Sequence, residues 1–151
     1  MTGDERYMRQ ALYLAEKAYA RGEVPVGALL VGPSGVLARA YNRREELHDA
    51  TAHAEILVLR KAGKKLGSWR LLDTTLYVTL EPCPMCAGAL VHARISRLVY
   101  GARDPKGGAA GSLYTIPTDT RLNHRLAVQE GVLADECAAL LKKFFSERRN
   151  Q

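Results

Sequence analysis

The sequence runs Glu81-Pro82-Cys83-Pro84-Met85-Cys86 where a strand-like segment, residues 74–80, gives way to a helix. Pro84 suits the first turn of that helix, because a missing N–H costs nothing there. Residues i and i+3 are neighbours on a helix, so Cys83 and Cys86 present both sulfurs to one side. The pattern predicts a strand that leads directly into a helix start carrying two metal ligands.

A third ligand can come from His53-Ala54-Glu55, upstream of the two cysteines. Three protein ligands leave the fourth tetrahedral position of a zinc ion open, as a catalytic zinc requires. Glu55 is then a candidate acid/base beside an activated water. Residues two apart on a regular helix point about 200° away from each other. The spacing therefore predicts a helix that starts at residues 51–53, with His53 and Glu55 in its irregular first turn.

The N-terminal part of the chain predicts a helix followed by a hairpin. Thr2-Gly3-Asp4-Glu5 has the form of a capping box, and an amphipathic pattern continues to Arg21-Gly22. Residues 24–31 and 36–42 are strand-like runs on either side of a Gly-Pro-Ser-Gly turn. The first run is apolar on both faces, which predicts an interior strand with Pro25 at its beginning.

Strands and helices alternate through the rest of the chain. Predicted loops cover residues 42–50 and 104–112; predicted helices cover 51–63, 84–93 and 135–149; predicted strands cover 74–80, 97–102 and, more weakly, 126–129. Alternation from residue 70 onward indicates parallel strands with crossover helices. We expect one domain over residues 1–151, a three-layer α/β/α sandwich around a mixed, roughly five-stranded sheet.

The composition is that of an ordinary soluble globular protein, with 47% hydrophobic and 25% charged residues among 151. No apolar run approaches the roughly 20 residues of a membrane span, and the N-terminus lacks an apolar signal core. We therefore expect no membrane association and a cytoplasmic location. A net charge of +6 favours a polyanionic partner. Three cysteines fit poorly with a disulfide framework.

Each half of the proposed site has an ordinary interpretation when taken alone. A Cys-x-x-Cys pair is more often half of a structural zinc site or a redox pair, and a lone His-x-Glu means little. Together they match the His-x-Glu…Pro-Cys-x-x-Cys signature of zinc nucleobase deaminases. His48 and His92 lack ligand spacing and are interpreted as ordinary polar residues, and Cys137 lies on the apolar stripe of the last helix.

Nearly the whole chain resembles the bacterial tRNA-specific adenosine deaminases, a family of the cytidine deaminase-like superfamily. The His-x-Glu and Pro-Cys elements alone indicate only the superfamily, whereas the Asn-His-Arg segment and the basic C-terminal helix indicate the RNA enzymes. The matching stretches are Gly22-Glu23-Val24-Pro25-Val26-Gly27-Ala28, Tyr41-Asn42, Asp49-Ala50-Thr51-Ala52-His53-Ala54-Glu55, residues 77–86, Leu122-Asn123-His124-Arg125, Leu140-Leu141-Lys142-Lys143-Phe144-Phe145 and Arg148-Arg149.

The resemblance implies a homodimeric hydrolase that converts adenosine to inosine at the wobble position of a tRNA anticodon stem-loop. It implies one Zn²⁺ per subunit, bound by His53, Cys83 and Cys86. In the family, zinc-bound hydroxide attacks C6 of adenine and ammonia leaves. Glu55 occupies the place of the residue that shuttles protons.

The resemblance also implies three RNA contacts near the pocket. Asn42 matches a base-contacting asparagine, although a turn-capping role is equally expected without the resemblance. Asp104 and Lys106 match a loop that lies against the extruded nucleotide and its neighbours. Lys106 would pair with a phosphate, and Asp104 would accept from a 2′-hydroxyl. Without the family, that loop is a flexible glycine-rich connector.

Two further contacts are expected on the final helix. Phe145 can stack on an anticodon base; core packing is the alternative, which we favour for Phe144 and weigh evenly for Phe145. Arg149 is a candidate phosphate contact, although terminal arginines are usually solvated. The competing functions are deamination of a free base, such as guanine or cytosine, and a non-catalytic zinc-stabilised RNA-binding module.

Overall fold

The structure is a computed structural model, and it describes residues 1–149. Its helices are α1 (Gly3–Ala20), α2 (Arg44–Leu47), α3 (Ala54–Leu66), α4 (Pro84–His92), the short 3-10 helix η1 (Ile116–Thr118) and α5 (Ala134–Arg149). Its strands are β1 (Gly27–Gly32), β2 (Gly35–Tyr41), β3 (Thr75–Leu80), β4 (Arg97–Ala102) and β5 (Ala127–Gln129). Among the residues described, no helix has both the length and the apolar character needed to cross a bilayer.

The five strands form one mixed sheet in the order β2-β1-β3-β4-β5. β1 is antiparallel to both β2 and β3, whereas β3, β4 and β5 run parallel. The predicted mixed sheet and the interior position of β1 are therefore confirmed. Pro25 lies ahead of β1, where its missing N–H interrupts no ladder.

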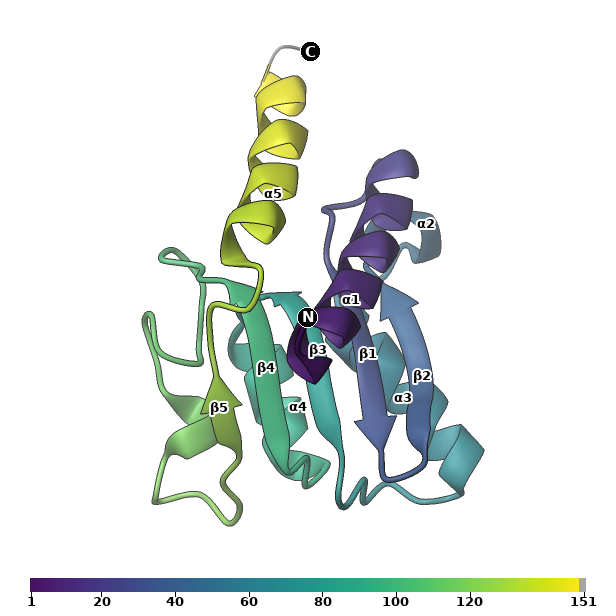
Figure 1. Cartoon of the computed structure of the whole chain (residues 1–151), viewed down its shortest axis with the longest axis vertical. Helices are drawn as coiled ribbons and strands as arrows, with labels where there is room; N and C mark the ends of the chain where they lie inside the picture. Colours follow the sequence, from purple (N-terminus) through teal and green to yellow (C-terminus); the bar gives the residue numbers. More distant parts are fainter. Residues whose placement is uncertain (150–151) are drawn as a thin grey trace.

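Helices cover both faces of the sheet, which confirms the three-layer sandwich (Figure 1). Successive strand residues point to opposite faces. Leu29 and Tyr77 accordingly pack with α1 and the first turn of α5, while Leu30 and Val78 pack with α3 and α4. The C-terminal half of α5 extends beyond the carboxyl ends of β3 and β4 (Figure 1).

Close packing and polar contacts hold α1 on its face of the sheet. A Cβ atom on Gly27 would lie 2.1 Å from the carbonyl oxygen of Ala11, so only glycine lets α1 approach β1 this closely. Arg97 on β4 donates two hydrogen bonds to Asp4, at 2.9 and 2.7 Å. Tyr77 on β3 donates a third at 2.7 Å. The start of α1 is therefore tied to two strands.

The helix expected from residues 51–53 begins later, at Ala54, and this part of the prediction was wrong. Asp49 Oδ1 accepts hydrogen bonds from both the N–H and the hydroxyl of Thr51, at 2.8 and 2.7 Å, which folds residues 49–51 into a turn. His53 then has extended backbone, with φ −74° and ψ 152°, and is the N-cap residue of α3.

The segment expected to be entirely loop, residues 42–50, contains the short helix α2. Glu23 stabilises it from outside. Glu23 is 2% exposed, and its carboxylate accepts the N–H groups of Glu45 and Glu46 at 3.1 and 2.9 Å. These are donors that a helix start leaves without intrahelical partners.

Candidate active site

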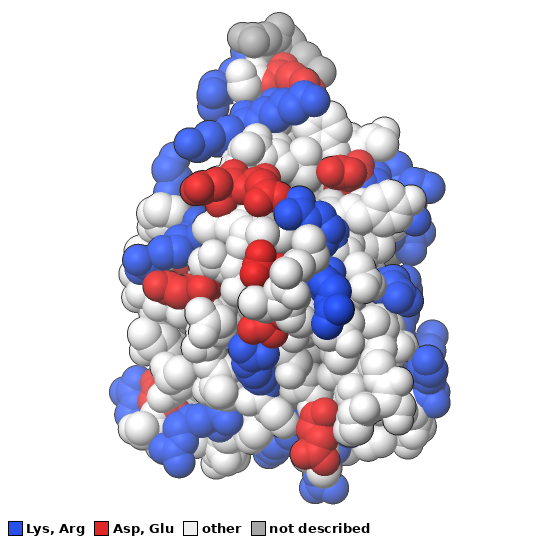
Figure 2. Space-filling view, in the orientation of Figure 1, with Lys and Arg blue, Asp and Glu red and all other residues white. Residues whose placement is uncertain are grey.

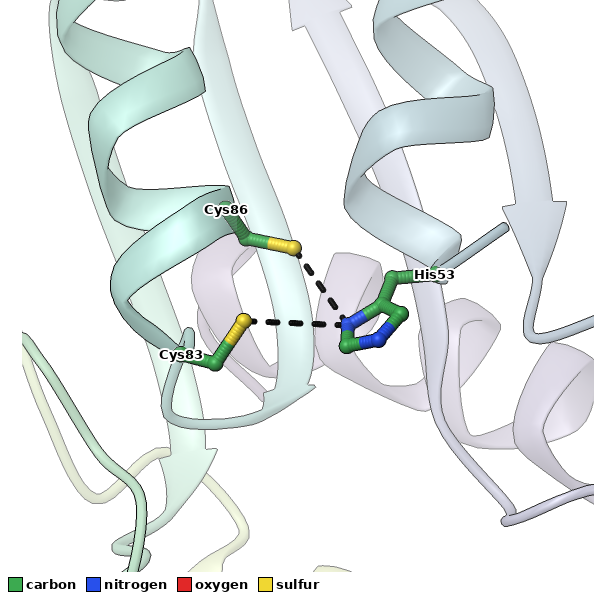
Figure 3. A group of neighbouring side chains, drawn as sticks. All are labelled: His53, Cys83 and Cys86. Carbon is green, nitrogen blue, oxygen red and sulfur yellow. Dashed lines mark hydrogen bonds between the residues drawn. The ribbon is translucent and has the colours of Figure 1, made fainter. Parts of the chain in front are cut away.

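Three potential metal ligands meet where α3 and α4 begin (Figure 3). His53 and Cys83 are the N-cap residues of the two helices, and Cys86 lies in the first turn of α4. His53 Nδ1 is 3.5 Å from Cys86 Sγ and 3.8 Å from Cys83 Sγ. All three donor atoms lie within 4.8 Å of one another. Both sulfurs thus face the same ring nitrogen.

These distances fit a single tetrahedral metal ion. With Zn–S near 2.3 Å and Zn–N near 2.0 Å, tetrahedral geometry separates a nitrogen from a sulfur ligand by about 3.5 Å. The hydrogen bond from Cys86 lowers the pKa of Cys83 to about 4, while the same bond raises the pKa of Cys86. A cation between the sulfurs would favour both thiolates, and the positive ends of two helices would add to that effect.

Glu55 is the second residue of α3 and lines the same cavity as His53 and Cys83. Because His53 has extended rather than helical backbone, the two-residue spacing does not turn its side chain away from that of Glu55. The sequence predicted that His53 and Glu55 can share one pocket only at the start of a helix. The structure meets this condition in a modified form, with His53 just before α3 and Glu55 inside it. Glu55 is 4% exposed, and burial raises its pKa to about 7.

Asn42 lies at the end of β2 and also lines this cavity. It is 6% exposed, and its Oδ1 accepts the N–H of Ala54 at 2.8 Å. Ala54 opens α3, and His53 itself makes no side-chain cap. Asn42 therefore caps α3 from a distant part of the chain, which is the capping role that the sequence left open, made to a helix rather than a turn.

The segment with Asp104 and Lys106 follows β4, and both residues line the cavity. Asp104 Oδ1 accepts the N–H groups of Lys106 and Gly107, both at 3.1 Å, which shapes a tight turn. The carboxylate of Glu81 accepts the N–H groups of Asp104, Ala110 and Ser112, so it contacts both ends of residues 104–112. Burial acts to raise the pKa of Glu81, but hydrogen bonds from Ser112 and from backbone N–H groups outweigh it and lower that pKa.

Helix α5 forms another wall of the cavity, whose volume is about 870 Å³. Phe145 is 45% exposed and lines it, whereas Phe144 is buried with its ring centroid 5.4 Å from that of Phe145. The favoured core position of Phe144 is thus confirmed. Arg149 also lines the cavity, at the end of α5.

Cationic side chains collect around this cavity, and sequence reasoning missed most of them. They are Arg44, Arg103, Lys106, Lys142, Arg148 and Arg149. In Figure 2, Lys and Arg side chains follow α5, while the adjoining face carries both signs of charge. Of these six, only Lys106 and Arg149 were predicted as RNA contacts; Lys142 and Arg148 lie in stretches that match the family but were given no role. His48, His92 and Cys137 lie outside the metal-binding group.

Comparisons with known proteins agree with this geometry. The family described as MafB19-like deaminase matches residues 2–149. A solved structure from a study of A-to-I editing by tRNA:A34 deaminases at the wobble position has a TM-score of 0.86 and 49% identity, covering 89% of this chain and 98% of that one. The guanine deaminase of Nitrosomonas europaea has a TM-score of 0.84 at 25% identity, covering 97% and 86%. Fold and site together define a deaminase of the cytidine deaminase-like class.

Curated relatives identify the family within this class of deaminases. The tRNA-specific adenosine deaminase of Bacillus subtilis is 52% identical over 151 residues, which is 100% of this chain and 94% of that protein. The enzyme of the same name from Haemophilus influenzae is 52% identical over 149 residues, 98% and 86% of the two chains. The chain belongs to the family of tRNA-specific adenosine deaminases, and it is a hydrolase.

Proposed function

We propose that this chain deaminates adenosine to inosine at the wobble position of a tRNA anticodon. One observation carries the proposal: a single cavity joins the deaminase residues to a wall suited to single-stranded RNA. His53 and Glu55 line its interior, and Phe145 and several cations line the remainder. Cations pair with phosphates, and an exposed aromatic ring stacks on a base.

We infer that His53, Cys83 and Cys86 hold one zinc ion per subunit. Two thiolates and an imidazole are ligands that zinc favours, and they leave a fourth position open. Bound zinc would supply an activated water as the nucleophile for adenine C6.

Glu55 moves the protons in this mechanism. As the water oxygen bonds to C6, the Glu55 carboxylate accepts a water proton and passes it to a ring nitrogen. A second transfer carries the remaining proton of the oxygen added at C6 to the exocyclic nitrogen, so that the C6–N bond breaks, ammonia leaves and a carbonyl forms at C6. Burial keeps bulk water away from this carboxylate, so the proton it receives stays available for the substrate.

The remaining proposed contacts place the RNA. Asn42 would contact the adenine edge, and Asp104 and Lys106 would meet a 2′-hydroxyl and a phosphate of the extruded nucleotide or its neighbours. Phe145 would stack on an anticodon base, and Arg149 would pair with a phosphate. Anticodon bases are already unpaired, so extrusion of the target costs less than it would in a duplex.

We also propose that residues 1–151 act as one domain and assemble as a homodimer. Two apolar clusters packed on opposite faces of one sheet support the single domain. Met85, Leu113 and Tyr114 are apolar side chains that are 37%, 55% and 57% exposed, and burial against a second copy would remove them from water. Sedimentation at micromolar concentration distinguishes a dimer from a monomer.

A second candidate function, deamination of a free purine base, is favoured by the similarity to the guanine deaminase. The two functions require different residues in the cavity wall. A free base does not require the cations or the exposed ring of Phe145, because it has neither phosphates nor stacked neighbours. Direct comparison of substrates therefore separates the two.

The experiment is to incubate the protein with an anticodon stem-loop that carries adenosine at the wobble position, and to sequence for adenosine converted to a base read as guanosine. We expect conversion at that position and little activity on free adenosine or guanine. Equal activity on the free compounds would favour the second candidate.

A variant of Glu55 tests the mechanism and the non-catalytic alternative together. Glu55→Ala should lower the deamination rate by about 10² to 10⁴ while metal content and stem-loop affinity persist. Glu16→Ala, on an exposed part of α1, is the matched control and should leave the rate unchanged. Turnover that survives in Glu55→Ala contradicts the proposed proton shuttle.

A further inference from the structure

Glu81 is a buried acid that the proposed reaction does not use. It follows β3 directly and precedes the metal-binding Cys83 by two residues, yet it lies outside the group of metal donors. Its side chain is 2% exposed. A carboxylate is rarely buried to this degree unless hydrogen bonds satisfy it, so its partners indicate what it does.

All the hydrogen-bond partners of its carboxylate belong to one loop, residues 104–112. Oε1 accepts the N–H of Asp104 at 3.0 Å, at the start of the loop. Oε2 accepts the N–H groups of Ala110 and Ser112 at 3.0 and 2.9 Å, near its end. The Ser112 hydroxyl donates to Oε1 as well. One carboxylate thus fastens both ends of the loop.

The middle of the loop passes directly over the same carboxyl group. A Cβ atom on Gly108 would lie 2.3 Å from Glu81 Cδ, so no larger residue fits there without displacing the loop. The neighbouring N–H of Ala109 donates to the carbonyl of Pro82 at 2.8 Å. The loop therefore rests on Glu81 and on the segment that leads to the metal-binding cysteines.

Fastened in this way, the loop presents a fixed wall to the cavity. Asp104 and Lys106 both line it, as do Asn42 and His53. Asp104 Oδ1 accepts the N–H of Lys106 and closes the turn between the two residues. The N–H of Asp104 donates in turn to Glu81. A shift of the loop away from Glu81 would move Asp104 and Lys106 together, relative to the metal-binding side chains.

We propose that Glu81 is a positioning residue that sets the distance between the RNA-facing wall, residues 104–112, and the deaminase centre. It acts on substrate recognition through Asp104 and Lys106 and takes no part in proton transfer. This inference rests on the proposed function, because it assigns the wall to the nucleotides around the target adenosine.

The test uses Glu81→Gln in the full-length, metal-loaded protein. Glutamine has one acceptor oxygen, and its NH₂ group would face N–H donors that Glu81 now satisfies. We expect amide exchange of residues 104–112 to rise about tenfold, and KM for the stem-loop to rise about tenfold while kcat stays within about twofold. Zinc content should remain at the wild-type value. Unchanged KM, or loss of zinc, would overturn the proposal.

A double variant distinguishes positioning from general destabilisation. If Glu81 acts through Lys106, adding Glu81→Gln to Lys106→Ala should raise KM by no more than about twofold beyond Lys106→Ala alone. If the two substitutions instead raised KM by the product of their separate effects, Glu81 would not act through Lys106. Gly108→Ala, which pushes the loop off an intact Glu81, should reproduce the rise in exchange and KM, and it decides the matter if Glu81→Gln does not fold.

The amide-exchange measurement needs no substrate. A wild-type protein that fails to deaminate the stem-loop therefore overturns the proposed function, whereas unchanged exchange in both Glu81→Gln and Gly108→Ala overturns the role of Glu81.

Discussion

Asn42 accepts a hydrogen bond from the first N–H of α3, that of Ala54, so one side chain both lines the cavity and caps the helix that follows His53. Its amide oxygen is occupied by the backbone, and only the NH₂ group is left to donate to a base. The observed capping contact and the proposed base contact therefore use different atoms of one residue.

This division predicts different outcomes for two substitutions. Asn42→Asp keeps the capping oxygen, and its charge is favourable at a helix start, so the free energy of unfolding should change little. It removes the donor, so kcat/KM should fall. Asn42→Ala should lower both kcat/KM and stability, the latter by about 1 kcal/mol. Denaturant titration and stem-loop kinetics measure the two effects. Equal kcat/KM for Asn42→Asp and wild type would exclude the base contact.

Removal of metal should abolish activity, because His53, Cys83 and Cys86 form one donor group. We expect a strong chelator to stop deamination and added Zn²⁺ to restore it. Cys86→Ser should reduce metal content from about one ion per chain, by elemental analysis, since a hydroxyl is a poor zinc ligand. Cys137→Ser changes a buried cysteine on α5 and is the control. Comparable metal loss in both variants would indicate a general folding defect.

Phe144 and Phe145 are adjacent but should respond to substitution in opposite ways. Phe145→Ala should weaken stem-loop binding by about 1–3 kcal/mol, as loss of a stacking platform does, with little change in stability. Phe144→Ala should instead lower the free energy of unfolding by about 3–5 kcal/mol, because it leaves a cavity in the core. Binding titrations and thermal melts provide the two readouts. Undiminished RNA affinity in Phe145→Ala would assign Phe145 to the exposed surface alone.

The contacts of Asp4 predict how stability depends on pH. The hydrogen bond from Arg97 lowers the pKa of Asp4 below its ordinary value of 3.8. A group with a depressed folded-state pKa contributes its stabilisation above the unfolded-state value and loses it as pH falls through the folded-state value. Asp4→Asn should therefore be less stable than wild type at pH 7, and the difference should shrink below about pH 4. A difference that is constant from pH 7 to pH 2 would contradict this assignment.

The parts of the fold predicted from the sequence are those with a local cause. Alternation of strands and helices predicted the parallel strands, and the N-terminal hairpin made the predicted sheet mixed. The Cys-x-x-Cys spacing predicted which two sulfurs meet at the start of α4. The late start of α3 also has a local cause, because Asp49 and Thr51 form a turn of known type. That signal was present in the sequence and was overlooked.

The contacts that sequence reasoning missed are long-range and polar. Glu23 and Glu45 are 22 residues apart, and Glu81 and Ser112 are 31 apart. A carboxylate that satisfies distant backbone N–H groups leaves no periodic trace, since only the folded chain brings donor and acceptor together. For the same reason, Arg44 and Arg103 could not be told from ordinary surface charges until the fold placed them at the cavity.

The order of these parts along the chain has a consequence for how the protein can diversify. The three potential metal ligands and Glu55 lie between residues 53 and 86. The aromatic and cationic wall on α5 comes from the last part of the described chain. Substitutions at exposed α5 positions such as Lys142, Phe145 and Arg149 change the wall without altering the potential metal ligands or the buried side chains of α5. We therefore expect variation in α5 to alter RNA binding separately from the deamination chemistry, while the contacts proposed for Asn42, Asp104 and Lys106 stay in place.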